Sequence, residues 1–421
     1  MIVKKNSIFS YLVLSALLFT SCKDGNSIFN PDYESPNARP VVTSISPAGN
    51  YLAGVDSVIV TGTGFSSVLD EMTINFGGSP GVIKVASETE LIVRPGTISG
   101  ESLPVFVSRR GAEFLSEEYA YTLRQPQGIY PGVTADFKPV SPAGIDSDNN
   151  IYVLAEQSAS FRLFKIFPDG TVEVDGVKNL GEFKPDDTPY PADSTLSFPA
   201  STYTDIEVGT NGQLFMTTSS VQAIFLKTFG DDRREGVWGF SSTSSLRIRD
   251  IVFDDNNFLW VVGRGSNEIH RFNVDNQSET KYPFSGDLNA IAFYEPDNEL
   301  YIGGLIDGKQ QVWKFAIDGS GSIGAGELYF DYEDNYEGEI TSLILASNGE
   351  LLIGNSGETG IVRVFPSLVH EPFYPGMIKP GTFSITWRDD EFAVVGVKGD
   401  DASLNFMDMY DRTRAGIFGF N

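Results

Sequence analysis

The feature that most constrains the fold is a segment that recurs six times in the later part of the chain. The clearest copy is FDDNNFLWVVG at 253–263, in which a polar Asp/Asn turn precedes a run of large apolar residues. The other copies are GIDSDNNIYVLA (144–155), DIEVGTNGQLFMTT (205–218), AIAFYEPDNELYIGG (290–304), SLILASNGELLIGN (342–355) and SITWRDDEFAVVGV (384–397). Their spacing of about 40 to 60 residues suits a repeated unit of four short strands.

Such a repeat predicts a six-bladed β-propeller over residues 128–421, because one four-stranded sheet cannot bury both faces without a neighbour on each side. Most copies continue into a third strand that carries a basic residue. This residue is Lys165, Lys227, Arg271, Lys314 or Arg363, whereas the sixth copy has Asp408 there. The pattern resembles that of NHL-type propellers.

The two aspartates of 253–263 have two interpretations, a calcium loop or a hairpin turn. A calcium loop needs six to eight converging oxygens at fixed positions. The equivalent turns read GTNGQ, EPDNE, ASNGE and RDDE, so polarity is kept while the carboxylates are not. This favours a turn, in which Asn, Asp and Gly tolerate left-handed backbone. The same alignment places Trp260 and Trp387 in columns of apolar residues, which predicts blade packing.

Residues 40–125 form a different unit, in which short alternating segments are separated by Gly, Pro and Ser. They predict a small antiparallel sandwich. The run PVVTSISPAG, GVDSVIVTGTGFSS, INFGG and ASETELIVRPG resembles the immunoglobulin-like IPT/TIG domain along nearly its whole length. That resemblance implies a spacer or binding module without catalytic machinery. The expected fold class is therefore all-β, with a sandwich followed by a propeller.

The N-terminus predicts export. Lys4 and Lys5 precede the apolar run IFSYLVLSALLFTS, which is too short to span a bilayer but has the length of a signal-peptide core. The segment LFTSC resembles a bacterial lipobox, which implies a signal peptide at 1–21 and lipidation of Cys22, the single cysteine. Residues 22–39 then read as a polar linker. The arrangement resembles Bacteroidetes lipoproteins, which implies an outer-membrane anchor and exposure at the cell surface.

The net charge of the chain limits the classes of molecule that it can bind. A formal net charge of −26 disfavours nucleic acid and polyanionic glycans, which need clustered Lys and Arg. We therefore expect no nucleic-acid partner, and membrane contact through the lipid anchor only. Aromatic side chains beside Arg, Asn and Glu suit sugars, whose C–H faces stack while their hydroxyls take directed hydrogen bonds.

Candidate ligand contacts lie where the repeats differ, mainly in loops that enter the innermost strands and loops between the second and third strands. They are Tyr203, Thr204, Arg249, Arg264, Asn289, Tyr336, Glu339 and Phe383, with Trp238 added because it falls outside the aligned columns.

Three functions fit these observations. The first is non-catalytic capture of neutral polysaccharide for a transporter of the SusC/SusD kind, which the domain layout resembles. The second is a calcium-dependent hydrolase like the six-bladed lactonases, with Asp205, Asp250, Asn289 and Glu339 as ligands. The third is a protein-binding or adhesion module. No nucleophile elbow, phosphate-binding loop or HxxxH pair occurs in the sequence, so no catalytic residue and no cofactor other than calcium is predicted.

Overall fold

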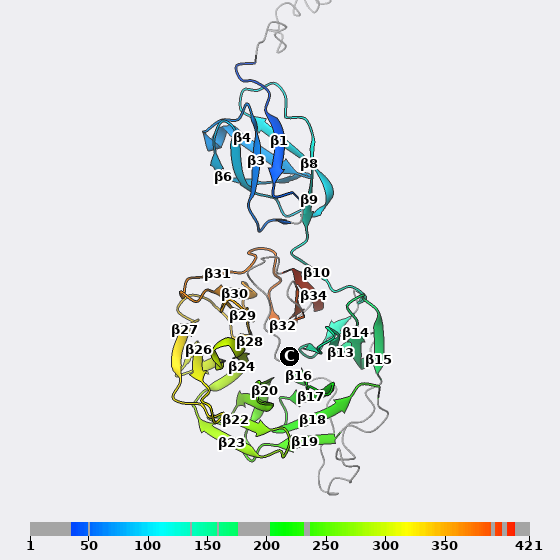
Figure 1. The fold of residues 1–421 in the computed structure, drawn as a ribbon, viewed down its shortest axis with the longest axis vertical. Helices are drawn as coiled ribbons and strands as arrows, with labels where there is room; N and C mark the ends of the chain where they lie inside the picture. The colour runs from blue at the N-terminus through cyan, green and yellow to red at the C-terminus, as the bar shows by residue number, and fades with distance from the viewer. Residues whose placement is uncertain are drawn as a thin grey trace, which may run out of the picture.

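The computed structural model describes residues 35–408, apart from 49–50, 135–136, 158–159, 176–202, 231–235, 389–391 and 398–401. The predicted signal peptide, Cys22 and most of the linker lie outside the described residues. Figure 1 shows two β-rich parts joined by a short connection. Helix in the described residues is limited to two 3₁₀ turns, η1 (Leu69–Glu71) and η2 (Glu295–Asp297). Neither turn is long and apolar enough to cross a membrane.

The N-terminal part is a sandwich of two sheets. One has the order β1-β3-β7-β6 and the other the order β2-β9-β8-β4-β5. The strands are β1 (Val41–Ser46), β2 (Tyr51–Leu52), β3 (Val58–Thr63), β4 (Met72–Phe76), β5 (Ser79–Pro80), β6 (Val82–Ala86), β7 (Glu90–Arg94), β8 (Gly100–Arg109) and β9 (Tyr119–Arg124).

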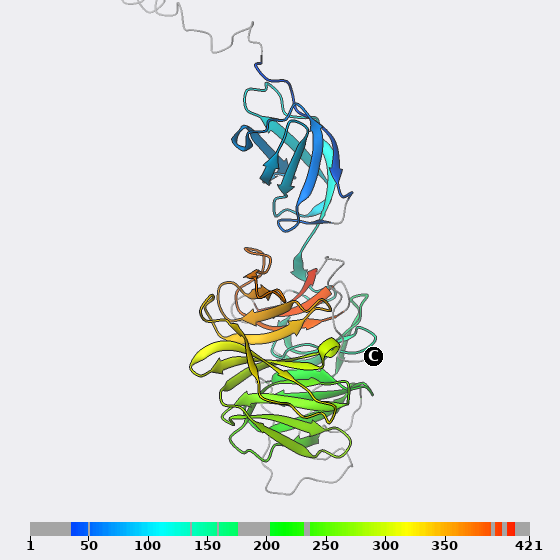
Figure 2. The ribbon, with the colours of Figure 1, turned by 60° about the vertical axis from the view of Figure 1, so that its left-hand side comes forward.

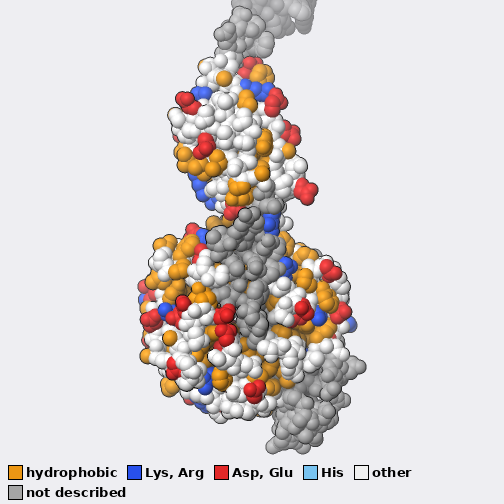
Figure 3. Space-filling model, in the orientation of Figure 1, with side chains coloured by type: hydrophobic (Ala, Val, Ile, Leu, Met, Phe, Trp, Pro, Cys, Tyr) orange, Lys and Arg blue, Asp and Glu red, His pale blue; other side chains and the backbone are white. Residues whose placement is uncertain are grey.

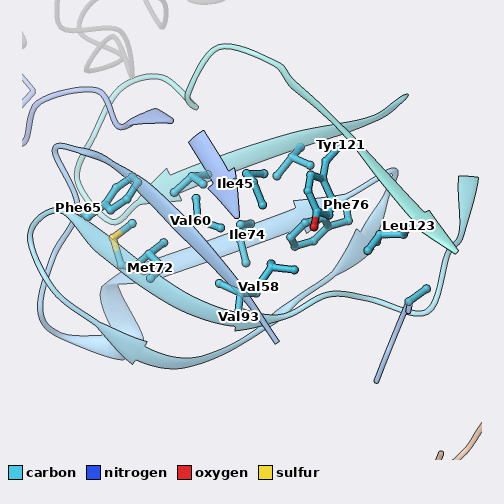
Figure 4. Close-up of a cluster of buried hydrophobic side chains, with 14 residues drawn as sticks. Ile45, Val58, Val60, Phe65, Met72, Ile74, Phe76, Val93, Tyr121 and Leu123 are labelled. Carbon is cyan, nitrogen blue, oxygen red and sulfur yellow. The ribbon is translucent and has the colours of Figure 1, made fainter. Parts of the chain in front are cut away.

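The sandwich core follows from the period of two along each strand. In β3, Val58 and Val60 are buried while Ile59 between them is exposed, because successive side chains point to opposite faces of a sheet. Figure 4 shows these valines among Ile74, Phe76 and other apolar side chains contributed by both sheets. The fold class predicted for this region is confirmed.

The C-terminal part is a six-bladed propeller, also as predicted (Figure 1). Blade 1 contains β11 (Lys138–Pro139), β12 (Gly144–Ile145), β13 (Ile151–Gln157), β14 (Ser160–Ile166) and β15 (Val172–Asp175). Blade 2 contains β16 (Tyr203–Val208), β17 (Gln213–Thr218), β18 (Ala223–Thr228) and β19 (Gly236–Phe240). Blade 3 contains β20 (Arg247–Phe253), β21 (Phe258–Arg264), β22 (Glu268–Asn273) and β23 (Glu279–Pro283).

The remaining blades repeat this order. Blade 4 contains β24 (Asp287–Tyr294), β25 (Glu299–Ile306), β26 (Lys309–Ala316) and β27 (Glu327–Asp331). Blade 5 contains β28 (Ile340–Leu345), β29 (Leu351–Asn355), β30 (Ile361–Val364) and β31 (His370–Pro372). Blade 6 contains β32 (Thr382–Trp387), β33 (Phe392–Val397), β34 (Ser403–Asp408) and β10 (Gln127–Ile129).

The ring is closed by a strand from the other end of the propeller sequence. β10, which directly follows the sandwich, pairs antiparallel with β34 and so becomes the outermost strand of blade 6. Hydrogen bonds between chain-distant strands thus join the first and last blades, and this pairing protects the edge of β34.

Apolar side chains fill the spaces between neighbouring blades. Between blades 2 and 3, for example, Phe215 and Trp238 pack against Phe253 and Phe272. Comparable clusters occupy the other inter-blade spaces. Trp260 and Trp387 are buried in two of them, which confirms the packing role predicted from their columns.

The sandwich contacts the propeller at the connection between β31 and β32. Leu52 belongs to the same buried cluster as Phe373 and Ile378, and Val55 and Met377 pack against it. Figures 1 and 2 both place the sandwich beside this side of the propeller. Residues 125–126 are all that separate β9 from β10, so an apolar contact and a short connection together join the two parts.

Candidate functional site

A cavity of about 990 Å³ occupies the centre of the propeller and is lined by the inner strands of several blades. Its lining includes Ile145, Thr204, Arg249, Ile291 and Phe383. The inner strands of a propeller lie around its central axis. Equivalent positions of the repeats therefore surround the cavity at the same depth. Differences between the repeats at that depth therefore decide the chemistry of the cavity.

A β-bulge marks the start of the inner strand in five blades. The register shifts at one residue in each pairing of first and second strands. The unpaired residues are Thr204, Arg249, Asn289, Thr341 and Phe383. A bulge inserts an extra residue and redirects its side chain, and bulges are common beside functional sites. We call this end of the cavity the mouth. Four of the candidate ligand contacts named from the sequence are bulge residues.

Arg264 organises one side of the mouth. From the end of β21, its Nε donates to Asn289 Oδ1 at 2.9 Å and its Nη2 lies 2.9 Å from Glu339 Oε2. Three predicted contact residues from blades 3, 4 and 5 are thereby brought together. Their mutual bonds hold the three side chains in one arrangement.

Arg249 lies near Arg264 and Glu339, and one of its N–H donors makes no hydrogen bond to a described residue. Its Nε is buried and has no hydrogen-bond partner among the described residues. Burial lowers the pKa of Arg249, and the nearby positive charge of Arg264 lowers it further. A buried donor without a partner among the described residues is one that an ordered water or a ligand can satisfy.

Deeper in the cavity, Asp205 and Asp250 connect adjacent blades. Asp205 Oδ2 accepts a hydrogen bond from the Ile251 backbone at 3.0 Å, and Asp250 Oδ2 accepts one from the Ile291 backbone at 2.8 Å. The two carboxyl groups are close enough for the charge of Asp205 to raise the pKa of Asp250 further. Burial raises the pKa of Asp205 to about 6 and raises that of Asp250 well above its usual range.

Ser342 performs the same task in blade 5, where its Oγ accepts a hydrogen bond from the Ile385 backbone at 3.0 Å. Asp205, Asp250 and Ser342 occupy equivalent positions, one residue after the bulge. The position thus has a structural role between neighbouring inner strands.

Glu207 is a cavity residue that the sequence analysis did not name. It lines the cavity at the level where the neighbouring blades carry Val252, Ala292 and Ile344. Burial, and then the charge of Asp205, raise the pKa of Glu207 well above its usual value. The signal in the sequence is that Glu207 is the single acidic residue in its column of the repeat alignment, where the other copies have Gly144, Val252, Ala292, Ile344 and Thr386.

The four residues proposed as calcium ligands belong to two different sets. Asp205 and Asp250 follow the bulge, and their oxygens accept backbone hydrogen bonds. Asn289 is itself the bulge residue, and with Glu339 it binds the guanidinium of Arg264. In the described part of the chain, no group of three His, Cys, Asp or Glu residues is arranged to hold a metal ion. A guanidinium bound to two of the four residues does not fit a calcium site.

Three other candidates lie away from the mouth. Tyr203 is buried in the apolar cluster between blades 1 and 2, and Trp238 in the cluster between blades 2 and 3. Both side chains pack between blades instead of contacting a ligand at the mouth. Successive side chains of a strand point to opposite faces of its sheet, and these two point into the space between neighbouring blades. Tyr336 donates or accepts a hydrogen bond at 2.8 Å with His370 Nδ1 on the outermost strand of blade 5, away from the mouth.

The turn at 254–258 is a hairpin whose aspartate is fully used. Asp254 Oδ1 accepts hydrogen bonds from the backbones of Asn256 and Phe258, and Oδ2 accepts one from Trp260 Nε1 at 2.8 Å. Asn257 has a left-handed backbone with φ of 59°. In blade 1, Asp146 repeats the arrangement with the hydroxyl of Tyr152. These bonds support the turn interpretation over the calcium loop.

A serine–histidine–glutamate group lies within blade 3. Ser266 Oγ is 3.3 Å from His270 Nε2, and His270 Nδ1 is 2.8 Å from Glu279 Oε1. Ser241, which follows β19, donates to the same Glu279 oxygen at 2.6 Å. The His270 side chain has no exposed surface, and none of these residues lines the central cavity. The group joins blades 2 and 3 and lacks the accessible nucleophile that a hydrolase needs.

Comparisons with known proteins support the fold. Residues 40–123 match the IPT/TIG domain family model. A solved structure from Bacteroides thetaiotaomicron, provisionally assigned as a phosphatase, matches with a TM-score of 0.51 and 8% identity. This match covers 89% of this chain and 98% of the other, and it shows a shared fold only. No curated protein sequence matches the chain.

Two further solved structures are similar at a lower level. An auxiliary nutrient binding protein from Bacteroides thetaiotaomicron has a TM-score of 0.49 and 11% identity, covering 90% of this chain and 98% of its own. A calcium-binding protein, regucalcin, from Agrobacterium tumefaciens has a TM-score of 0.48 and 14% identity, covering 69% of this chain and 97% of its own.

Proposed function

We propose that this protein is a non-catalytic, surface-exposed lipoprotein that binds neutral polysaccharide at the mouth of its propeller and presents it for uptake. The observation that carries the proposal is the polar group at the mouth of a 990 Å³ cavity, where Arg249 lines the cavity beside the bonded set of Arg264, Asn289 and Glu339. The hydroxyl and ring oxygens of a sugar accept hydrogen bonds of the kind that the guanidinium of Arg249 donates.

The residues around Arg249 support the same ligand class. Arg264, Asn289 and Glu339 present donors and acceptors in a fixed arrangement, and Phe383 adds an aromatic ring to the cavity lining. On the face drawn in Figure 3, acidic side chains are scattered over both domains between neutral and apolar ones. Together with the net charge of −26, this favours a neutral glycan over a uronate or sulfated chain.

Binding is tested by calorimetric titration of residues 23–421 with neutral polysaccharides and their oligosaccharides, both with calcium and with chelator. Arg249→Ala is expected to weaken binding by about tenfold or more, since a hydrogen bond to a charged donor contributes roughly 1.5 to 3 kcal/mol. Arg247→Ala is the matched control, because this exposed arginine on the same strand donates to the nearby backbone carbonyls of Ser244 and Leu246. Equal binding by both variants would place the ligand elsewhere.

The anchor belongs to the proposal as well. The lipobox-like LFTSC segment supports attachment through Cys22, with the linker and sandwich holding the propeller away from the membrane. Wild-type protein is expected in the outer-membrane fraction and accessible to protease added to intact cells. Cys22→Ala should appear in the soluble fraction. Protection of the wild-type protein in intact cells would overturn the surface location and leave glycan binding to be judged by titration.

A further inference from the structure

A second cavity, of about 310 Å³, lies between blades 3 and 4. Its lining consists of Pro283, Phe284, Ser285, Ile306, Asp307 and Trp313. Pro283 ends β23 and Ile306 ends β25. The other lining residues lie in the loop that enters β24, in the turn between β25 and β26, and in β26 itself. In a propeller, loops into the inner strands and loops between second and third strands lie on one face. The second cavity therefore opens on the same face as the mouth.

The aromatic wall of this cavity is held rigidly. Trp313 Nε1 donates to Gln311 Oε1 at 3.0 Å, so the polar edge of the indole is already bonded. Phe284 packs against the Trp313 ring with centroids 5.4 Å apart and against Phe315 at 5.0 Å. Ile306, which also lines the cavity, is buried. A preformed apolar surface of this kind needs little reordering when a ligand arrives.

The rim of the cavity is polar. Ser285 and Asp307 are both exposed, so a hydroxyl and a carboxylate stand beside the aromatic wall. Asp307 is held in the turn by a left-handed backbone with φ of 50°, followed by Gly308 with φ of 83°. Apolar ring faces with hydrogen-bonding groups at the edge match a ligand that is itself apolar on its faces and hydroxylated at its edge.

We infer that this second cavity is a subsite for a single sugar ring of a neutral glycan chain whose other rings contact the mouth. The volume is at the lower end for small-molecule pockets, which suits one ring and excludes a longer segment. Ser285 is four residues from Asn289 at the mouth, a separation of no more than about 14 Å. One extended chain can therefore reach both places. The inference rests on the proposed function, and it adds Trp313 and Phe284 to the binding surface.

Trp313 provides a direct probe. Of the four tryptophans in the chain, Trp238, Trp260 and Trp387 are 6%, 0% and 5% exposed, whereas Trp313 is only half-buried. Quenching of intrinsic fluorescence by acrylamide should therefore report mainly on Trp313. Trp313→Phe should remove most of the quenchable emission, which identifies its source before any glycan is added.

The experiment combines this probe with glucans, mannans, galactans, xylans and fructans, each as polymer and as short oligosaccharides. A polymer that binds by calorimetry is expected to reduce acrylamide quenching of Trp313 at least about twofold. Trp313→Ala should weaken polymer binding by about two- to twelvefold, as one aromatic contact of roughly 0.5 to 1.5 kcal/mol predicts. It should leave binding of the shortest oligosaccharides unchanged, and Trp313→Phe should restore most of the loss. Thermal melts of both variants identify any loss of folding.

The outcomes separate this inference from the proposed function. Polymer binding that is lost in Arg249→Ala but never shields Trp313 would overturn the subsite and leave capture at the mouth intact. Shielding by polymer together with an unchanged affinity in Trp313→Ala would also overturn it, because the ring would then lie near the ligand without contributing. Failure of every glycan to bind would overturn both.

Discussion

At the scale of single residues, Asp254 illustrates how one side chain determines a turn. Its carboxylate accepts three hydrogen bonds, from Asn256, Phe258 and the indole of Trp260, and it is fully buried. Asp255, directly after it, is exposed. Two adjacent aspartates that look alike in the sequence therefore have different roles.

Asp254→Ala is expected to destabilise the protein by about 2 to 4 kcal/mol, because it removes a charged acceptor and leaves the buried Trp260 N–H unpaired. Asp255→Ala should change the free energy of unfolding by less than about 0.5 kcal/mol, as is usual for exposed positions. Denaturant titration of both variants measures the difference. A calcium-dependent rise in wild-type stability that Asp254→Ala abolishes would instead identify a metal loop.

Single residues also show which features of the site could be predicted from the sequence and which could not. The sixfold repeat was sufficient to predict the propeller, the hairpin turns and the burial of Trp260 and Trp387. It did not separate Asn289 from Asp205 and Asp250, which were grouped as calcium ligands. The reason is the bulge, because an offset of one residue turns a side chain to another side of the strand. A bulge depends on pairing between strands and leaves no clear local signature, so the grouping at the mouth required the structure.

At the scale of elements, the inner strands are joined by side chains that accept backbone hydrogen bonds from the next blade. Asp205 binds the Ile251 backbone in this way, and Asp250 binds that of Ile291. Between blades 2 and 3, Glu279 makes a further connection through Ser241 and Ser242. The carboxyl groups in these two connections have pKa shifts of opposite sign. Burial raises the pKa of Asp205, whereas hydrogen bonds from the serines overcome burial and lower the pKa of Glu279.

The raised pKa of Asp205 and the lowered pKa of Glu279 predict opposite effects of pH on the free energy of unfolding. Asp205 has a pKa of 3.8 when exposed and about 6 in the folded protein, so between these values the folded state keeps a proton that the unfolded chain has lost. Its contribution to stability is present below pH 3.8 and is lost as pH rises through about 6. Asp205→Asn should reduce the fall in unfolding free energy between pH 4 and 7 by roughly 1 to 3 kcal/mol.

Glu279→Gln is the matched comparison. Because the folded pKa of Glu279 lies below its exposed value of 4.5, its contribution is present above that pH and is lost as pH falls through the folded value. This variant should leave the fall between pH 4 and 7 in place and reduce the loss of stability in acid. Denaturant midpoints measured at half-unit intervals from pH 3 to 7.5 give both slopes. Identical profiles for wild type and Asp205→Asn would contradict the assignment.

At the scale of the whole molecule, the position of the sandwich relative to the propeller depends on a small apolar contact. Leu52 is 1% exposed within the cluster formed by the connection between β31 and β32, and Met377 packs against the same cluster. A Cβ added to Gly54 would lie 2.9 Å from Met377 Sδ, so the two surfaces approach closely. With only residues 125–126 between β9 and β10, this contact should fix the direction in which the propeller face that carries the mouth points relative to the sandwich.

Leu52→Asp is therefore expected to release the sandwich from the propeller without unfolding either domain. Burying a carboxylate among apolar groups is unfavourable by several kcal/mol, so the interface should open instead. Small-angle scattering should then show a larger radius of gyration and a wider distribution of dimensions, and calorimetry should show two unfolding transitions that no longer coincide. Ile59→Asp, on the exposed face of the sandwich, is the control.

If polysaccharide affinity in solution stays unchanged in Leu52→Asp while uptake by whole cells falls, the sandwich acts by orienting the propeller at the surface. If uptake also stays unchanged, fixed orientation is not needed for delivery of the glycan.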